Sequence, residues 1–160
     1  MSRPRKRQEL LLHLEHLLRE SSAQGILFSH AVAERVALAS SDLECLDIIQ
    51  LRAPVTAGQL AQATGLTTGA ITGVIDRLEE AGYARRDRDP KDRRKVLVRP
   101  LPALTRRILP HFQSLQRAMA RNLASYTDRE LEFLVEFFTR GCEIMRDEIA
   151  KLQVAARRER

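Results

Sequence analysis

The sequence predicts a mainly α-helical protein with one small β-hairpin, and three observations support this fold class. Leu, Ala, Glu and Arg dominate the 160 residues, Trp is absent and aromatic residues make up 4%, which is a helix-forming composition. Strand-forming patterns are confined to residues 83–99. Directly before them, two short amphipathic segments flank a Thr-Gly-Leu-Thr turn. Helix, turn, helix and hairpin in this order predict a winged helix-turn-helix, with the remaining helices forming a dimerisation part.

Length and patterning also predict how the chain is organised. We expect N-terminal dimerisation helices over residues 1–40, a winged helix-turn-helix over 41–100 and C-terminal dimerisation helices over 101–160. The chain has no run of 18 apolar residues and no signal-peptide pattern at its start. We therefore expect a cytoplasmic protein without a membrane partner.

The N-terminal segment predicts helices over residues 5–22 and 26–38, unless Gly25 only bends one long helix. A third helix, over 42–51, is expected to begin at a capping box made by Ser41 and Glu44. The first helix carries leucines on one face that we assign to dimerisation, namely Leu10, Leu14 and Leu17.

The two helices that flank the turn contain clear end signals. Thr56 and Gln59 predict a capping box at the start of the first of them. Gly65 suits the left-handed residue that ends this helix, and Thr67 is the expected N-cap of the second. Apolar residues at steps of three and four then predict a shared core, with Ile71, Val74, Ile75 and Leu78 on the second helix and Leu60 and Ala61 on the first.

Prolines punctuate the chain after the hairpin. Pro100 and Pro102 are expected to stop the second strand, and a long helix is predicted over residues 103–125. Pro110 removes a backbone donor inside this helix, so we expect a kink there.

The last helix has the clearest pattern in the chain. Thr127 and Glu130 predict a third capping box at its start. An apolar seam follows in alternating steps of four and three, which predicts a second chain as partner; the first helix of the same chain is the alternative cover, and both can hold in an intertwined dimer. The seam consists of Leu131, Val135, Phe138, Cys142, Met145, Ile149 and Leu152, of which all but Cys142 are assigned to dimerisation.

Positive charge is concentrated in the predicted hairpin. Residues 85–99 contain six arginines, two lysines and three aspartates, so this segment carries +5 of the chain's net charge of +6. Residues 8–84 are acidic. A charge run alone often marks only a solvated surface, but beside a helix-turn-helix it indicates a polyanionic partner, double-stranded DNA.

The second helix of the pair is expected to read DNA through the face opposite its apolar residues. Two glycines inside a helix cost about 1 kcal/mol each relative to alanine, so they indicate close approach either to DNA or to a neighbouring helix. Arg77 is expected to contact a phosphate or to form an ion pair within the domain. The other candidates on or just before this helix are Thr67, Thr68, Gly69, Thr72 and Gly73.

The tip of the hairpin is expected to reach the minor groove. Arg94 is the first candidate to enter it and Arg93 the second, because the narrow groove has a strong negative potential. Asp92 would hold the tip in shape by pairing with a neighbouring arginine. Phosphate contacts, which give affinity and salt dependence rather than sequence choice, are assigned to Arg85, Arg86 and Lys95.

These parts together resemble the MarR family of bacterial transcriptional regulators over about residues 8–153. The specific likeness lies in VIDRLEEAGYARR at residues 74–86 and in the hairpin sequence DPKDRR at 89–94. Asp92 and Arg94 match the family's wing motif, and Thr72 matches a position on its recognition helix. The resemblance implies a homodimer that represses transcription, reads a pseudo-palindrome through successive major grooves and is released by a small, often aromatic and anionic, effector. No residue is assigned to the effector.

Two departures from the family pattern affect these expectations. Gly73 stands where many members carry a DNA-contacting arginine, so the base contacts should differ. The stretch VLVRPLPAL at residues 96–104 replaces the usual residues after the wing, which predicts a shifted start of the following helix.

Other functional classes have weaker support. The chain has no nucleotide-binding glycine loop and no recognisable nucleophile, so we expect no enzyme and no cofactor. Scattered histidines give no metal site. Cys45 and Cys142 lie on apolar helix faces, so we expect buried thiols and no disulfide. Redox sensing through either cysteine is kept as an alternative function. A winged-helix module that binds protein is a further alternative, but it does not explain the charge of the hairpin.

Overall fold

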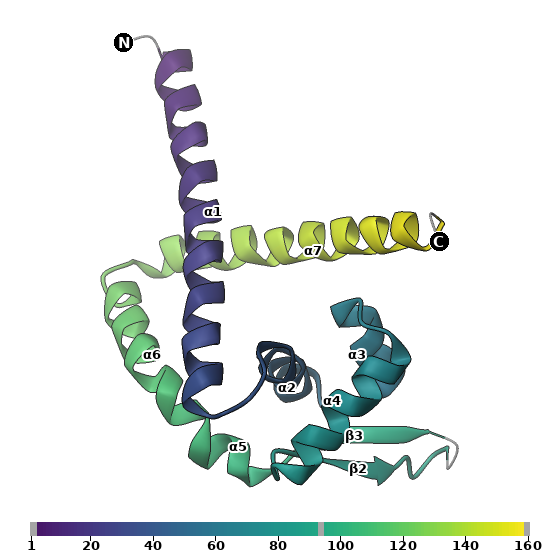
Figure 1. The fold of residues 1–160 in the computed structure, drawn as a ribbon. Helices are drawn as coiled ribbons and strands as arrows, with labels where there is room; N and C mark the ends of the chain where they lie inside the picture. Colours follow the sequence, from purple (N-terminus) through teal and green to yellow (C-terminus); the bar gives the residue numbers. More distant parts are fainter. Residues whose placement is uncertain (1–2, 93–94, 159–160) are drawn as a thin grey trace. The chain divides into compact units, whose positions relative to one another are not determined.

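The computed structural model describes residues 3–92 and 95–158 and is mainly helical, with one small antiparallel sheet (Figure 1). The chain divides into two compact units, one ending at Ile108 and one beginning at Leu109. The first unit contains α1 (Arg3–Arg35), α2 (Ser40–Arg52), β1 (Val55–Thr56), α3 (Ala57–Thr64), α4 (Thr68–Glu80), β2 (Ala84–Arg88), β3 (Val96–Pro100) and α5 (Pro102–Arg107). The second contains α6 (Leu109–Leu123) and α7 (Asp128–Arg158).

The first helix is one continuous element of 33 residues, so the expectation of two separate helices is wrong. Gly25 does not interrupt it, and nothing lies within 4 Å of where its Cβ would be. A single glycine in a helix lowers stability by only about 1 kcal/mol, which the rest of a long helix can absorb. The alternative of one long helix through Gly25 is therefore the correct one.

The second helix begins earlier than the sequence predicts. The backbone N–H groups of Asp42 and Leu43 both donate to the carbonyl of Ala39, so the helix starts at Ser40 and Ala39 is its N-cap. The capping box of Ser41 and Glu44 is wrong, because Ser41 already lies within the first turn. Its hydroxyl donates instead to Oδ1 of Asp42 at 3.4 Å.

The end signals around the turn are confirmed. Thr56 and Gln59 form a capping box, in which the Gln59 N–H donates to Thr56 Oγ1 at 3.2 Å and the Thr56 N–H donates to Gln59 Oε1 at 2.8 Å. Gly65 ends α3 in the left-handed conformation with φ of 75°. Thr67 caps α4 by accepting the N–H of Ala70 at 3.2 Å.

The sheet has three strands, one more than the sequence predicts. Their order is β1-β3-β2, and both pairings are antiparallel. The short β1 places Val55 opposite Val98, while β2 places Arg86 opposite Val98 on the other side. Pro100 is still part of β3, opposite Ala84, so the strand ends later than expected and Pro102 starts the next helix.

The core of the first unit lies between α2, α3, α4 and the sheet, which contact one another. The predicted inward face of α4 is confirmed, because all four of its apolar residues are buried. Leu60 is also buried, and Ala61 is half-buried. The largest fully buried apolar side chains are Leu43, Leu46, Ile49, Leu60, Ile71, Ile75, Leu78, Leu104 and Ile108.

The long helix predicted after the hairpin is two helices. It breaks at Ile108, the C-cap of α5, rather than bending at Pro110. In a continuous helix, Pro110 would have no N–H to donate to the carbonyl of Arg106 and its ring would clash with that carbonyl, which favours an interruption at this point. The capping box of α7 is confirmed, since the Thr127 N–H donates to Glu130 Oε2 at 2.8 Å and lowers the pKa of that carboxyl.

Replacing Gly65 with alanine is expected to lower the free energy of unfolding by about 1 kcal/mol, because a side chain is strained at this positive φ. Urea denaturation at one fixed protein concentration measures the change. Gly25→Ala is the matched control, since it lies in open space within a helix and should be neutral or stabilising. Equal effects of the two substitutions would contradict the prediction.

Candidate nucleic-acid interface

The first turns of α4 present an exposed face of short side chains. Thr68, Gly69 and Thr72 are exposed, as is the capping residue Thr67. The hydroxyl of Thr72 donates to the carbonyl of Thr68 at 2.9 Å, which uses its only proton and leaves its methyl group and oxygen lone pairs for other contacts. The capped N-terminus of α4 therefore carries a surface made of hydroxyl, methyl and backbone groups.

Among the described residues, no neighbouring helix lies against the positions that a Cβ would take at the two glycines of α4. A Cβ at Gly69 would meet nothing within 4 Å, and one at Gly73 would lie 3.5 Å from Nη1 of Arg77, at the end of that side chain. The sequence left two explanations for these glycines. Close packing against another helix has no partner in the described part of the chain, so close approach to an external surface is the explanation that remains.

Arg77 forms an ion pair within the domain. Its Nε donates to Asp42 Oδ2 at 2.8 Å and its Nη2 to Asp42 Oδ1 at 2.7 Å, a two-pronged arrangement between α4 and α2. The Asp42 side chain is only 3% exposed, whereas that of Arg77 is 53% exposed. Hydrogen bonds to Asp42, and then its charge, raise the pKa of Arg77. Of the two roles expected for Arg77, the ion pair is the one the structure describes.

Arg86 of β2 is held by two carboxylates of α4. Its Nη2 lies 2.6 Å from Asp76 Oδ1, and its Nη1 forms an ion pair with Glu79. The backbone N–H of Arg86 also donates to Glu79 Oε1 at 2.6 Å. Burial lowers the pKa of the guanidinium, but the hydrogen bonds to both carboxylates more than offset this and raise it overall. The phosphate contact predicted for Arg86 stays a prediction. The two carboxylates already balance the charge of its guanidinium within the domain.

The other charges of the hairpin pair along and across the strands. Asp87 lies 3.2 Å from Arg85 and 3.4 Å from Arg99, both measured from Oδ2 to Nε. Asp92 lies 3.7 Å from the Nζ of Lys95, so its described partner is a lysine. The predicted tip residues Arg93 and Arg94 lie outside the described residues.

Arg88 and Lys91 are two exposed cations that the sequence reading did not single out. Within the described ranges, neither side chain takes part in an ion pair. Strand alternation could have identified Arg88, because Arg85 and Asp87 lie on one face of the strand and Arg88 lies on the other. Charge pairing thus leaves positive charge available at the tip end of the hairpin rather than along its whole length.

The two cysteines differ. Cys45 is fully buried, and burial together with the charges of Asp42 and Glu44 raises the pKa of its thiol to about 11. Cys142 is exposed, so the expectation that it is buried is wrong; α7 leaves this part of its surface uncovered in the single chain. Both thiols are free.

Large apolar side chains remain exposed on α1 and α7. On α1 the predicted dimerisation leucines are 43–60% exposed. On α7, Leu131 is half-buried, while Val135, Phe138, Met145, Ile149 and Leu152 are exposed. Burial of such surface is strongly favourable, so these faces are candidates for contact with another apolar surface, and the predicted dimerisation role stays a prediction.

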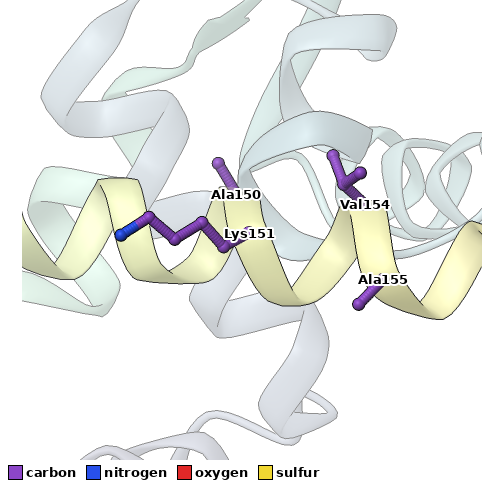
Figure 2. Close-up of a pocket in the computed structure, with 4 residues that line it drawn as sticks. All are labelled: Ala150, Lys151, Val154 and Ala155. Carbon is purple, nitrogen blue, oxygen red and sulfur yellow. The ribbon is translucent and has the colours of Figure 1, made fainter.

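A hollow on α7 gives no ligand site. Ala150, Lys151, Val154 and Ala155 line it, and Figure 2 shows all four on successive turns of the same helix, with Ala155 pointing away from Ala150 and Val154. Small-molecule pockets enclose most of their ligand, which one helix face cannot do. The described residues also contain no helix able to span a membrane and no metal-binding cluster of His, Cys, Asp and Glu.

Comparison with known proteins gives consistent similarities. The sequence profile of the MarR family matches residues 38–96. An uncharacterized HTH-type transcriptional regulator, YcgE of Bacillus subtilis, is 37% identical over 153 residues, which cover 96% of this chain and 99% of that protein. The fold is similar to that of a MarR family protein from Bacillus stearothermophilus (TM-score 0.65, 23% identity, 86% of this chain and 96% of that one). It is also similar to the transcriptional regulator BldR from Sulfolobus solfataricus (TM-score 0.52, 26% identity, 88% and 99%).

Cys45 is expected to resist alkylation in the native protein, while Cys142 reacts. With a pKa of about 11, roughly one Cys45 thiol in a thousand is ionised at pH 8, and burial blocks access to it. Iodoacetamide treatment followed by peptide mass spectrometry measures both sites in one sample. Denatured protein, in which both should react, is the control. Rapid native labelling of Cys45 would contradict the prediction.

Proposed function

Because this chain belongs to the MarR family of helix-turn-helix transcriptional regulators, we propose that it is a homodimeric repressor that binds a pseudo-palindromic DNA duplex and releases it when a small effector binds. The family assignment establishes a transcriptional regulator rather than an enzyme. The observation that carries the rest is the exposed, glycine-containing face of α4, which lies next to a basic hairpin and has no packing partner in the described part of the chain.

In this proposal α4 is the recognition helix and lies in the major groove. Thr67, Thr68 and Thr72 supply hydroxyl and methyl groups for base edges and phosphates, and Gly69 and Gly73 let the helix backbone come close. The exposure of the three threonines and of Gly69, together with the capped N-terminus of the helix, supports this role. Arg77 and Arg86 are assigned to holding the helix, since their charges are balanced within the domain.

The hairpin is the wing. Its tip enters the minor groove, with Arg94 as the leading candidate on the strength of the sequence motif. We add Arg88 and Lys91 as phosphate contacts, because they are exposed cations without a carboxylate partner in the described ranges. Arg85 and Lys95 contribute less, since each shares its charge with an aspartate.

The exposed apolar faces of α1 and α7 supply the dimer interface. A second copy offers the same leucine-rich and phenylalanine-rich surfaces, and two copies place two recognition helices on one duplex about one helical turn apart. The effector is expected to be small and aromatic or anionic, as the family resemblance implies. To act as an inducer it must bind the DNA-incompetent arrangement of the dimer more tightly than the competent one.

Two alternative functions have less support. A winged-helix module that binds protein gives no reason for unpaired cations at the end of the hairpin. Redox control through Cys45 conflicts with its burial and its raised pKa. Redox control through Cys142 rests on exposure alone.

The proposal predicts salt-sensitive binding to duplex DNA. Arg94→Ala should weaken binding about tenfold or more at every sequence, and Thr72→Ala should change the preference among sequences. Mobility-shift titrations on the DNA that flanks the gene, at two salt concentrations, measure both effects. A protein that binds no duplex, or binds independently of salt and of Arg94, would exclude this function.

Gly69→Ala should separate stability from DNA binding. Alanine is the better helix former and has open space at this position, so the free energy of unfolding should rise by up to about 1 kcal/mol. The added methyl group should nevertheless weaken DNA binding about tenfold, because it lies on the face that approaches the bases. Gly25→Ala is the control, expected to leave DNA binding unchanged. Unchanged binding by Gly69→Ala would show that this glycine does not meet DNA.

A further inference from the structure

The hairpin follows α4 after a short connection in which Gly82 has a φ of 73°. The third strand, β1, pairs with β3 at Val98 and Leu97, which lie opposite Arg86 and Asp87, so no β1 pairing extends beyond this level toward the tip. From Ala84 to Arg88 the strand spans about 13 Å at the usual rise of a strand. A rotation of about 10° at its base would displace Arg88 by about 2 Å. A wing that must meet a groove at a set distance from α4 is therefore held more precisely by direct bonds to that helix.

Arg86 supplies such bonds at the level of the strand where Val98 is buried in the core. It lies in β2, and its guanidinium contacts Asp76 Oδ1 at 2.6 Å and the carboxylate of Glu79, one turn further along α4. Its backbone N–H donates to Glu79 Oε1 at 2.6 Å, so both the main chain and the side chain of the strand are bonded to the helix. The remaining contact of the guanidinium is with the Thr72 carbonyl, at 3.4 Å from Nη2. These bonds all run between the hairpin and the proposed recognition helix.

We propose that Arg86, Asp76 and Glu79 form a positioning clamp that fixes the wing against α4, so that the two enter neighbouring grooves as one rigid body. The inference rests on the proposed function, because it concerns how that DNA-binding surface is held. Arg86 is in this view a positioning residue and not a phosphate contact. Arg88, two residues further along the same strand, is the matching residue that is exposed and unpaired among the described residues.

The clamp and simple electrostatics predict opposite changes in DNA affinity when one of the two carboxylates is removed. Asp76 and Glu79 place two negative charges on the helix that approaches DNA, so removing one of them should tighten binding if only charge mattered. If the carboxylates hold the wing through Arg86, removing one should weaken binding. Glu80 is the matched control, since it is an exposed acid beside Glu79 that forms no ion pair within the described ranges.

The experiment compares Glu79→Gln, Asp76→Asn, Arg86→Gln and the double variant Glu79→Gln with Arg86→Gln, and uses Glu80→Gln and Arg88→Gln as controls. Fluorescence anisotropy with duplex DNA that the wild-type protein binds, at four salt concentrations, gives affinity and its salt dependence. A titration to saturating protein, below the melting temperature of every variant, measures the fraction of each variant that binds DNA. This control separates loss of folded protein from loss of affinity.

We expect Glu79→Gln and Arg86→Gln each to weaken binding about five- to tenfold, with the double variant no weaker than either single one. The salt dependence of Arg86→Gln should match that of the wild type, whereas Arg88→Gln should lose about one phosphate contact from its slope. Glu80→Gln should bind equally well or more tightly. Tighter binding by Glu79→Gln, or a reduced salt slope for Arg86→Gln, would overturn the clamp and make Arg86 a phosphate contact.

A measurement without DNA tests the clamp independently of the proposed function. In the free protein, Glu79→Gln should speed amide hydrogen exchange at Arg86 and along β2, because one acceptor of the Arg86 N–H is weakened. Glu80→Gln should leave this exchange unchanged. Unchanged exchange in Glu79→Gln would overturn the clamp even if DNA binding is intact. Faster exchange in a protein that binds no duplex would retain the clamp and reject the proposed function.

Discussion

The position of α4 is the constraint on which the rest of the structure depends, and its buried apolar face and the ion pair of Asp42 and Arg77 set it together. Asp42 is the one charged residue that is buried in the described part of the chain. Two hydrogen bonds from Arg77 satisfy its carboxylate. Desolvation offsets much of the attraction in such a pair, so its main contribution is geometric rather than a large net gain in stability. The apolar face of α4 holds the helix in the core, and the ion pair fixes how it is turned relative to α2.

The distribution of charge acquires a different meaning once the pairs are known. The sequence places +5 on the hairpin, but Asp87 and Asp92 neutralise charge within it, and Arg86 is balanced from α4. Net charge therefore measures the long-range field, which attracts a polyanion, and not the number of side chains free to touch one. Arginines a few residues apart are thus assigned to structure and, in the proposed function, to binding, and only the partners of each side chain distinguish the two uses.

Features set by neighbouring residues, such as helix caps, were predictable from the sequence. Contacts between residues distant in sequence were not. The caps at Thr56, Thr67 and Thr127 depend on contacts within three residues, which is why their prediction is confirmed. The Ser41 cap is wrong because the helix starts two residues earlier than predicted, and β1 is too short to show a pattern. The partners of Arg77 and Arg86 lie 35 and seven or more residues away in sequence, so no local rule identifies them. For Arg93 and Arg94 the sequence motif is the whole basis of the assignment.

The exposed turn of α4 from Thr67 to Thr72 contains no Arg, Lys, Asn or Gln. Long side chains of these types let a helix read bases from a distance through paired hydrogen bonds. In the proposed function, the exposed threonine, alanine and glycine residues at this leading turn give the recognition helix a short reach, so insertion depth replaces side-chain length as the variable that decides which bases it can distinguish. Any substitution that thickens this turn would then act as a spacer, and the groove width of the target would become part of the sequence preference.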